Sequence, residues 1–180
     1  MILRSQDGCQ LSIGEYPTFK YNALGGGGKA IIKEEVNSNK KKIYFDPSKF
    51  EIPSLDFKTT KILGLAIPPG LEIKILTRKL EGDIDLKNGI LCLKFEARFS
   101  FTICSIFKAP DLLVKTFLTN KEQAHNSKDY GAKPFLNDRE IQLKGSANVP
   151  VTGNLLLDSF LSLPNEAKAI LVCKLYGIYD

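Results

Sequence analysis

The chain of 180 residues is 43% hydrophobic with a formal net charge of +5, so it is long enough for one buried core, short for two, and needs no metal or cofactor to hold it together. Its four cysteines contain no CxxC pair and lie far in sequence from the single histidine, His125, which excludes a zinc site of the usual spacing. No apolar run has the length of a signal peptide or approaches the roughly 20 residues of a membrane span, so we expect one soluble domain, residues 1–180, in a reducing, cytoplasmic compartment.

Apolar patterns typical of strands dominate the chain. In chain order they predict strands over residues 29–35, 42–45, 58–65, 71–86, 90–106, 112–118, 140–149 and 167–178. One helical pattern covers residues 153–163 and would end before Pro164, although the same residues could form a buried strand. Two polar stretches, 37–42 and 120–133, are typical of loops.

The clearest periodic signal lies within residues 90–106, where every second residue is apolar: Leu91, Leu93, Phe95, Ala97, Phe99, Phe101 and Ile103. This period of two predicts a strand with one face in water. Asn88 and Gly89 precede it and favour a two-residue hairpin turn back to the strand at 71–86, in which Gly82 is a candidate bulge. Upstream, Pro69 and Gly70 predict a type II turn.

These elements indicate an all-β fold, either an antiparallel β-sandwich or a closed β-barrel with one short helix near the C-terminus, because an α/β fold would need helices alternating with the strands. The 11 Phe and 6 Tyr concentrate on the parities that should point inward. Such an interior is either a filled core or the wall of an apolar ligand cavity. We expect a filled core, because protein interiors pack closely unless something else occupies the space.

A glycine run with a following lysine invites a phosphate-loop interpretation; it comprises Gly25, Gly26, Gly27, Gly28 and Lys29. The spacing argues against that interpretation, because Ala23 and Ala30 stand where a Walker loop needs Gly and Ser or Thr. We expect a hairpin, or a backbone that passes close to another segment, with a ligand-contact loop as the alternative.

The densest positive charge is at Lys40, Lys41 and Lys42, and the excess of positive charge lies in the first part of the chain. Residues 1–80 hold 13 Lys and Arg against 8 Asp and Glu, whereas residues 81–180 hold 12 of each. The three lysines are candidate contacts to an anion or to the headgroups of an anionic membrane, although a solvated loop is the simpler interpretation. Nucleic acid is an unlikely partner, because the cluster lacks arginines and has few aromatic neighbours.

Catalytic groups form no recognisable motif. Asp83 and Asp85 lie on one face of a predicted strand, and with Asp138 and Glu140 they are the carboxylates of the alternative hypothesis, a small metal-independent enzyme with its site in a barrel mouth. His125 lies in a polar stretch without a nucleophile elbow, so we expect an ordinary exposed histidine. We expect no catalytic residue, no metal ligand and no cofactor.

Four segments, residues 25–29, 45–47, 62–73 and 109–114, together resemble uncharacterised proteins of cyanobacteria and plant plastids. The resemblance covers about two-thirds of the chain and consists of turn and strand sequences, so no residue role follows from it. It implies a photosynthetic organism and a cytoplasmic or membrane-peripheral location. The sequence thus favours a non-enzymatic binding or assembly module that engages an apolar ligand, an anionic membrane surface or a protein partner.

Overall fold

The computed structural model describes residues 1–104, 106–121, 138 and 140–177 of the chain. The strands are β1 (Ile2–Ser5), β2 (Cys9–Ile13), β3 (Phe19–Tyr21), β4 (Gly27–Asn37), β5 (Lys40–Phe45), β6 (Thr60–Ile62), β7 (Leu65–Ala66), β8 (Leu71–Asp85), β9 (Ile90–Ile103), β10 (Phe107–Lys108), β11 (Leu112–Thr119), β12 (Glu140–Val149) and β13 (Asn165–Tyr176). The helix α2 (Leu155–Phe160) lies between the last two strands. All strand pairs are antiparallel, which confirms the predicted all-β fold with a short helix near the C-terminus.

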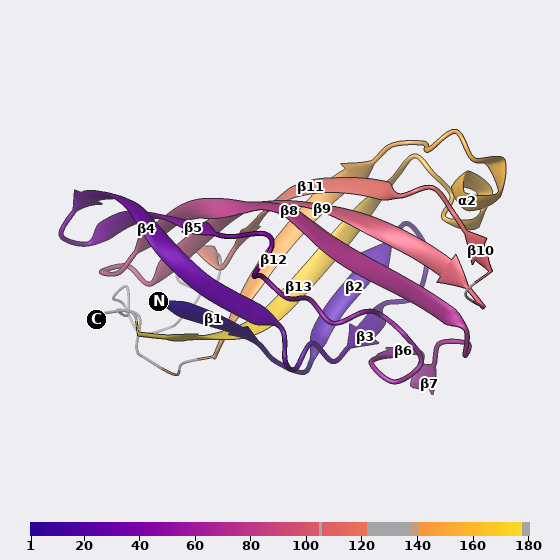
Figure 1. The fold of residues 1–180 in the computed structure, drawn as a ribbon, viewed down its shortest axis with the longest axis horizontal. Helices are drawn as coiled ribbons and strands as arrows, with labels where there is room; N and C mark the ends of the chain where they lie inside the picture. Colours follow the sequence, from indigo (N-terminus) through magenta and orange to yellow (C-terminus); the bar gives the residue numbers. More distant parts are fainter. Residues whose placement is uncertain (105, 122–137, 139, 178–180) are drawn as a thin grey trace.

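Hydrogen bonds run around a ring of strands in the order β1, β4, β5, β8, β9, β11, β12 and β13. The ring closes because β1 pairs on one side with β4 and on the other with the end of β13, where Leu3 lies opposite Gly28 and Leu175. β2 continues the direction of β1 and pairs with the first half of β13, and β3, β6 and β7 extend the sheet from there. Figure 1 shows the ring elongated, with the β4–β5 hairpin at one end and α2, β10 and β7 at the other.

The β8–β9 hairpin is the longest pairing of the sheet and runs from Leu71 opposite Ile103 to Asp85 opposite Ile90. Along β9, Leu91, Leu93 and Ala97 are buried. This burial confirms that the alternating pattern of residues 90–106 places its apolar side chains on one face, since neighbouring side chains of a strand point to opposite faces.

Two local predictions for this hairpin are wrong. The turn spans residues 86–89 rather than two residues, and within it only Gly89 has a positive φ, of 63°. Asp85 makes this longer turn possible, because its carboxylate accepts hydrogen bonds from the backbone and side-chain nitrogens of Asn88 at 3.0 and 2.8 Å. The irregularity of β8 lies between Thr77 and Lys79, whereas Gly82 pairs regularly with Leu93.

Other element boundaries also differ from the predictions. The strand predicted for residues 58–65 is two short strands, β6 and β7, and the helix ends several residues earlier than predicted. β4 and β5 extend into the stretch 37–42, so the loop between them shrinks to Ser38 and Asn39. The sequence did not reveal β1, β2 and β3, and most of the predicted loop 120–133, with His125, lies outside the described residues.

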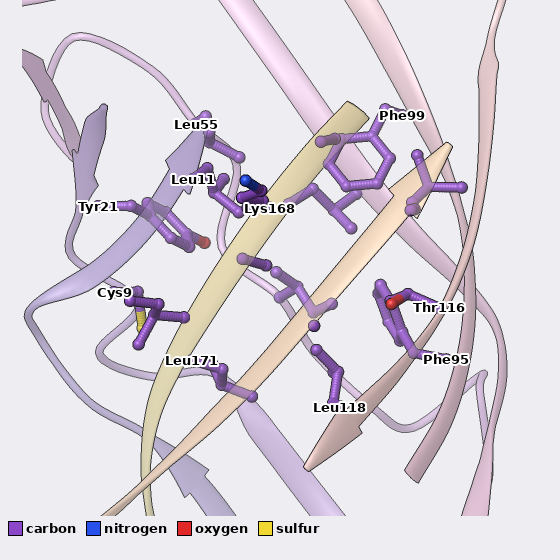
Figure 2. Close-up of a pocket in the computed structure, with 18 of the residues that line it drawn as sticks. Cys9, Leu11, Tyr21, Leu55, Phe95, Phe99, Thr116, Leu118, Lys168 and Leu171 are labelled. Atoms are coloured by element: carbon purple, nitrogen blue, oxygen red, sulfur yellow. The ribbon is translucent and has the colours of Figure 1, made fainter. Parts of the chain in front are cut away.

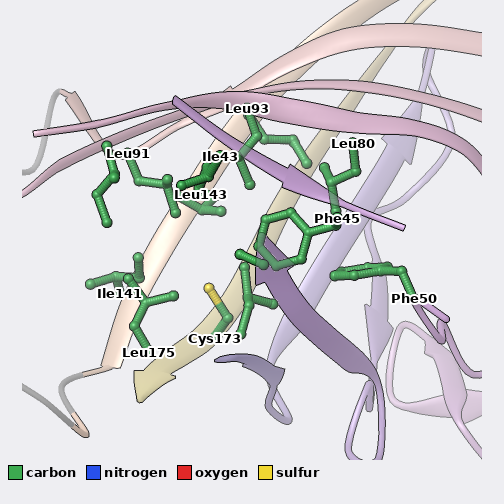
Figure 3. Close-up of a cluster of buried hydrophobic side chains, with 14 of the residues drawn as sticks. Ile43, Phe45, Phe50, Leu80, Leu91, Leu93, Ile141, Leu143, Cys173 and Leu175 are labelled. Atoms are coloured by element: carbon green, nitrogen blue, oxygen red, sulfur yellow. The ribbon is translucent and has the colours of Figure 1, made fainter. Parts of the chain in front are cut away.

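A first cluster of buried apolar side chains fills the ring where all its strands close. Every ring strand contributes to it: Leu3, Ala30, Ile43, Phe45, Leu80, Ile84, Leu91, Leu93, Leu118, Ile141, Leu143, Cys173 and Leu175, with Phe50 and Leu86 beside them. Figure 3 shows side chains of Phe45 and Phe50 meeting within this cluster, and their rings are edge to face with centroids 5.3 Å apart. The expectation of a filled core is confirmed for this part of the interior.

A second closely packed cluster lies at the opposite end of the interior, beneath α2. Leu157 and Leu161 pack there against Phe101, Leu112 and Val149 at the ends of three ring strands. The helix begins at Asn154, whose side chain accepts a hydrogen bond from the Leu157 nitrogen at 3.0 Å. α2 therefore covers one end of the ring, as expected for a capped helical turn with buried leucines on its inner side.

Candidate apolar binding site

Between these two ends lies a third group of buried apolar residues, several of which border a cavity: Cys9, Tyr21, Ala23, Leu55, Ile75, Ala97 and Val172. The cavity has a volume of about 190 Å³ and is lined by inward-facing residues of β2, β3, β8, β9, β11, β12 and β13 and by Phe50, Ile52 and Leu55 of the segment that follows β5. On β9 the lining extends from Leu93 to Phe101, about 26 Å along the strand at ~3.3 Å per residue. A cavity of about 190 Å³ that extends over this length of β9 is narrow and long.

Three alanines on β12 and β13 leave part of this space free, whereas Gly145 is closely packed, since a Cβ there would lie 2.5 Å from the Phe117 carbonyl oxygen. Gly145 lies directly opposite Ala169, and Ala147 lies opposite Ala167, and all four line the cavity. Ala147 continues the inward parity of the buried Leu143, so a larger side chain there would fill the ring. This pattern of small residues is readable in the sequence, and it is the signal that our expectation of a filled core overlooked.

Large side chains face the cavity from two sides. In Figure 2, Cys9, Leu11 and Tyr21 lie on one side of the β12 and β13 ribbons, Phe95 lies on the other side, and Phe99 lies between the upper ends of the two ribbons. Phe95 and Phe99 are only half-buried, although Leu93 and Ala97 on the same parity of β9 are fully buried. Both aromatic rings line the cavity, as does Leu93, and both pack against the buried residues around Ala97 and Val172.

The Tyr21 and Thr116 hydroxyls of the wall have partners within the protein. The hydroxyl of Tyr21 donates a hydrogen bond to the Pro53 carbonyl, and the hydroxyl of Thr116 donates one to the Ser146 carbonyl at 2.6 Å. Burial raises the pKa of Tyr21, so this hydroxyl stays protonated. Lys168 belongs to the outward parity of β13, and its ammonium lies 3.1 Å from the Glu166 carboxylate. The wall therefore offers apolar contact and little polar recognition.

We predict that the buried thiols resist modification while Cys104 reacts. Burial raises the pKa of both Cys9 and Cys173, which keeps them in the unreactive thiol form, whereas Cys104 is exposed. Treatment with Ellman's reagent at pH 8, followed by peptide mapping, should find Cys104 modified in the native protein and the two buried thiols modified only in guanidinium chloride. Rapid native modification of Cys173 would contradict the packing of the first cluster.

The glycine run is placed where the backbone approaches other segments. A Cβ on Gly27 would lie 2.1 Å from the Leu3 carbonyl oxygen, and one on Gly28 would lie 2.8 Å from the Phe50 ring. This agrees with the interpretation of a closely packed backbone. Gly25, Gly26 and Lys29 likewise are not among the residues that line the cavity, so a ligand-contact role for this run stays a prediction.

The lysine cluster lies on β5, and each of its amino groups faces a carboxylate. Lys40 lies 3.6 Å from Asp85, Lys41 lies 3.1 Å from Glu35, and Lys42 lies 2.8 Å from Glu34. Hydrogen bonding and the charge of Glu34 raise the pKa of Lys42. These pairs neutralise much of the positive charge that made the cluster a candidate for anion or membrane contact, and that role stays a prediction.

The candidate carboxylates do not converge on the cavity. No acidic residue is among the described residues that line it. Asp83 and Asp85 alternate with the buried Ile84 and so lie on the outer face of β8, and Asp138 lies 3.8 Å from the ammonium of Lys174, which is opposite Glu140 in the sheet. The arrangement lacks the paired carboxylates in a concave site that the enzyme hypothesis requires.

Searches for other kinds of site and for relatives gave no match. Within the described part of the chain, no three His, Cys, Asp or Glu side chains are placed to hold a metal ion. Its helices include none that is long and apolar enough to span a membrane. No family model, curated protein or solved structure matches the chain.

Proposed function

We propose that this protein binds an elongated apolar small molecule, of the shape of an acyl chain, inside the ring and performs no chemistry on it. The observation that supports the proposal is the narrow apolar cavity between the two packed ends. Interiors normally pack as densely as organic crystals. An apolar molecule in this cavity of about 190 Å³ would remove the apolar wall from contact with water, which is favourable.

The chemistry of the wall favours a chain over a polar or charged ligand. Water gains little in a cavity whose wall is mostly apolar, since a buried water needs two to four polar partners. A polar headgroup would find no free partner beside Phe95, Phe99 or Leu171, so we place the apolar part of the ligand inside and any polar group at the surface.

Titration with the fluorescent fatty acid cis-parinaric acid tests this proposal. We expect saturable binding of one molecule per chain, competition by oleate, and an affinity of saturated fatty acids that rises with chain length by up to ~0.8 kcal/mol per methylene group until the cavity is full. At a ligand concentration one hundred times the Kd, the bound protein should gain about 2.7 kcal/mol in unfolding free energy, visible as a higher Tm. Fluorescence that never saturates, with an unchanged Tm, would contradict the proposal.

A further inference from the structure

We infer that the end of the molecule formed by α2, β10 and the β6–β7 turn docks on the surface of an anionic lipid bilayer. This inference goes beyond the proposed function, because it assigns a second surface to a different partner. The end carries an exposed set of apolar side chains, which we call the apolar rim: Leu63, Leu65, Ile103, Ile106, Leu155, Leu156 and Phe160. Figure 1 shows α2, β10 and β7 at the same end of the longest axis, opposite the β4–β5 hairpin.

The three segments of the rim are joined through the ends of the β8–β9 hairpin. The Cys104 nitrogen donates a hydrogen bond to the Gly70 carbonyl at 2.8 Å, which ties the turn after β9 to the turn that follows β7. The Ala109 nitrogen donates to the Phe101 carbonyl at 3.1 Å, and Phe101 packs directly beneath α2. The rim is therefore one connected end of the fold rather than scattered surface leucines, which are common and need no explanation.

α2 is apolar on its buried side and presents three large apolar side chains to solvent. Leu157 and Leu161 are buried against the ring, while Leu155, Leu156 and Phe160 are 83%, 72% and 54% exposed. A surface helix normally turns mostly polar residues outward, whereas only Asp158 and Ser159 of this helix are polar. Ile106 and Leu63, at 91% and 81% exposure, project from turns in the same way. Side chains that protrude singly from turns suit insertion between lipid headgroups.

Positive charge accompanies the rim. Lys58, Lys61 and Lys108 lie in the same segments, and none of them forms an ion pair with a described carboxylate. Two carboxylates of this end are fixed by hydrogen bonds from backbone nitrogens: Asp56 accepts them from residues 58 and 59, and Asp158 accepts them from residues 152 and 153. Unpaired lysines beside exposed leucines are complementary to a bilayer with anionic headgroups.

The apolar rim lies next to one end of the cavity. The cavity lining reaches Phe101 and Leu161, directly on the inner side of α2. Docking by the rim would bring the covered end of the cavity to the bilayer, so that an apolar chain could pass between membrane and ring with little exposure to water. This last step rests on the proposed function, whereas docking itself rests on the rim and its lysines.

Sedimentation with phosphatidylcholine vesicles containing phosphatidylserine tests the inference. We expect the wild type to pellet with these vesicles and a variant with Leu63→Ser, Leu65→Ser, Leu155→Ser and Leu156→Ser to partition at least about tenfold less. Lys61→Glu with Lys108→Glu should weaken partitioning by about fivefold for each lysine and abolish the preference over pure phosphatidylcholine.

Two control variants separate the rim from other surfaces. Ile31→Ser, Ile32→Ser and Val36→Ser remove exposed apolar residues of the β4–β5 hairpin at the opposite end and should leave pelleting unchanged. Lys40→Gln, Lys41→Gln and Lys42→Gln should also pellet as the wild type does, because those lysines are paired. Circular dichroism melting confirms that each variant is folded.

The outcomes distinguish docking from ligand binding and from other partners. The four-serine variant should still bind cis-parinaric acid in the absence of vesicles, so loss of pelleting with retained ligand binding supports the inference. Unchanged pelleting of the folded four-serine variant would overturn it. The inference would also be overturned if the wild type did not bind vesicles but formed a dimer, and the four-serine variant were a monomer. In that case a second copy of the chain would cover the same surface.

Discussion

Ala169→Phe should abolish uptake of an apolar chain and leave the protein folded. Ala169 lies on the inward parity of β13 opposite Gly145, where it lines the cavity. A phenyl ring there would occupy the path of the ligand. Displacing about four methylene groups, at ~0.8 kcal/mol each, weakens binding by about a hundredfold or more. Because the phenyl group of the new side chain also fills empty space, the unfolding free energy should stay the same or rise by ~0.5–2 kcal/mol.

The matched control is Asn148→Phe on the neighbouring strand β12. Asn148 is exposed and lies on the outward parity of β12, so the same aromatic ring is added outside the cavity. Titration of both variants with cis-parinaric acid, combined with thermal melting, measures affinity and stability together. We expect wild-type affinity for the control. Equal affinities of the two folded variants would place the binding site elsewhere.

Gly27→Ala should strongly lower the unfolding free energy of the protein. Gly27 has a φ of 123°, which a residue with a side chain rarely adopts, and the added Cβ would lie 2.1 Å from the carbonyl oxygen of Leu3. The conformational strain costs ~1–3 kcal/mol and the steric overlap ~1–3 kcal/mol more. Since β4 pairs with β1 at this point, the substitution should open the ring at its closure.

Gly25→Ala separates the two causes of that loss. Gly25 also has a positive φ, of 90°, but a Cβ there would meet no atom within 4 Å. It should therefore cost only the conformational strain, about 1 kcal/mol. Urea unfolding of both variants gives the comparison. Equal stabilities of the two variants would mean that close approach of β1 and β4 does not explain the glycine run.

Strands with regular alternation were predictable from the sequence because side-chain parity is a local property. β12 spans residues 140–149 as the pattern indicates, and Leu91, Leu93 and Ala97 of β9 are buried as predicted, whereas Ile103 at the end of the strand is 48% exposed. The strands β1 and β3 have only four and three residues, so they are too short for a periodic signal. Their structure depends on pairing with distant segments, such as Leu3 with Leu175, which local sequence cannot reveal.

The candidate site could not be predicted from the sequence alone, because it depends on which strands are neighbours in the sheet. Ala147, Ala167 and Ala169 can be seen in the sequence as small residues of one parity, but that they border a common cavity follows only from the pairing of β12 with β13. The lysine cluster illustrates the opposite case. Its charges stand out in the sequence, and only the register of β5 with β4 and β8 reveals the carboxylates that face them. Pairing across the sheet thus decided both the cavity and the charge of the surface.

Diffraction from crystals grown with a bromine-labelled fatty acid tests the central claim most directly. The claim is that the interior of the ring, between Phe99 on β9 and Ala169 on β13, holds the apolar chain of a ligand. We predict a single anomalous bromine peak among Phe95, Phe99 and Leu171. A bromine peak only on the outer surface, or an interior that stays empty at saturating ligand, would contradict the account.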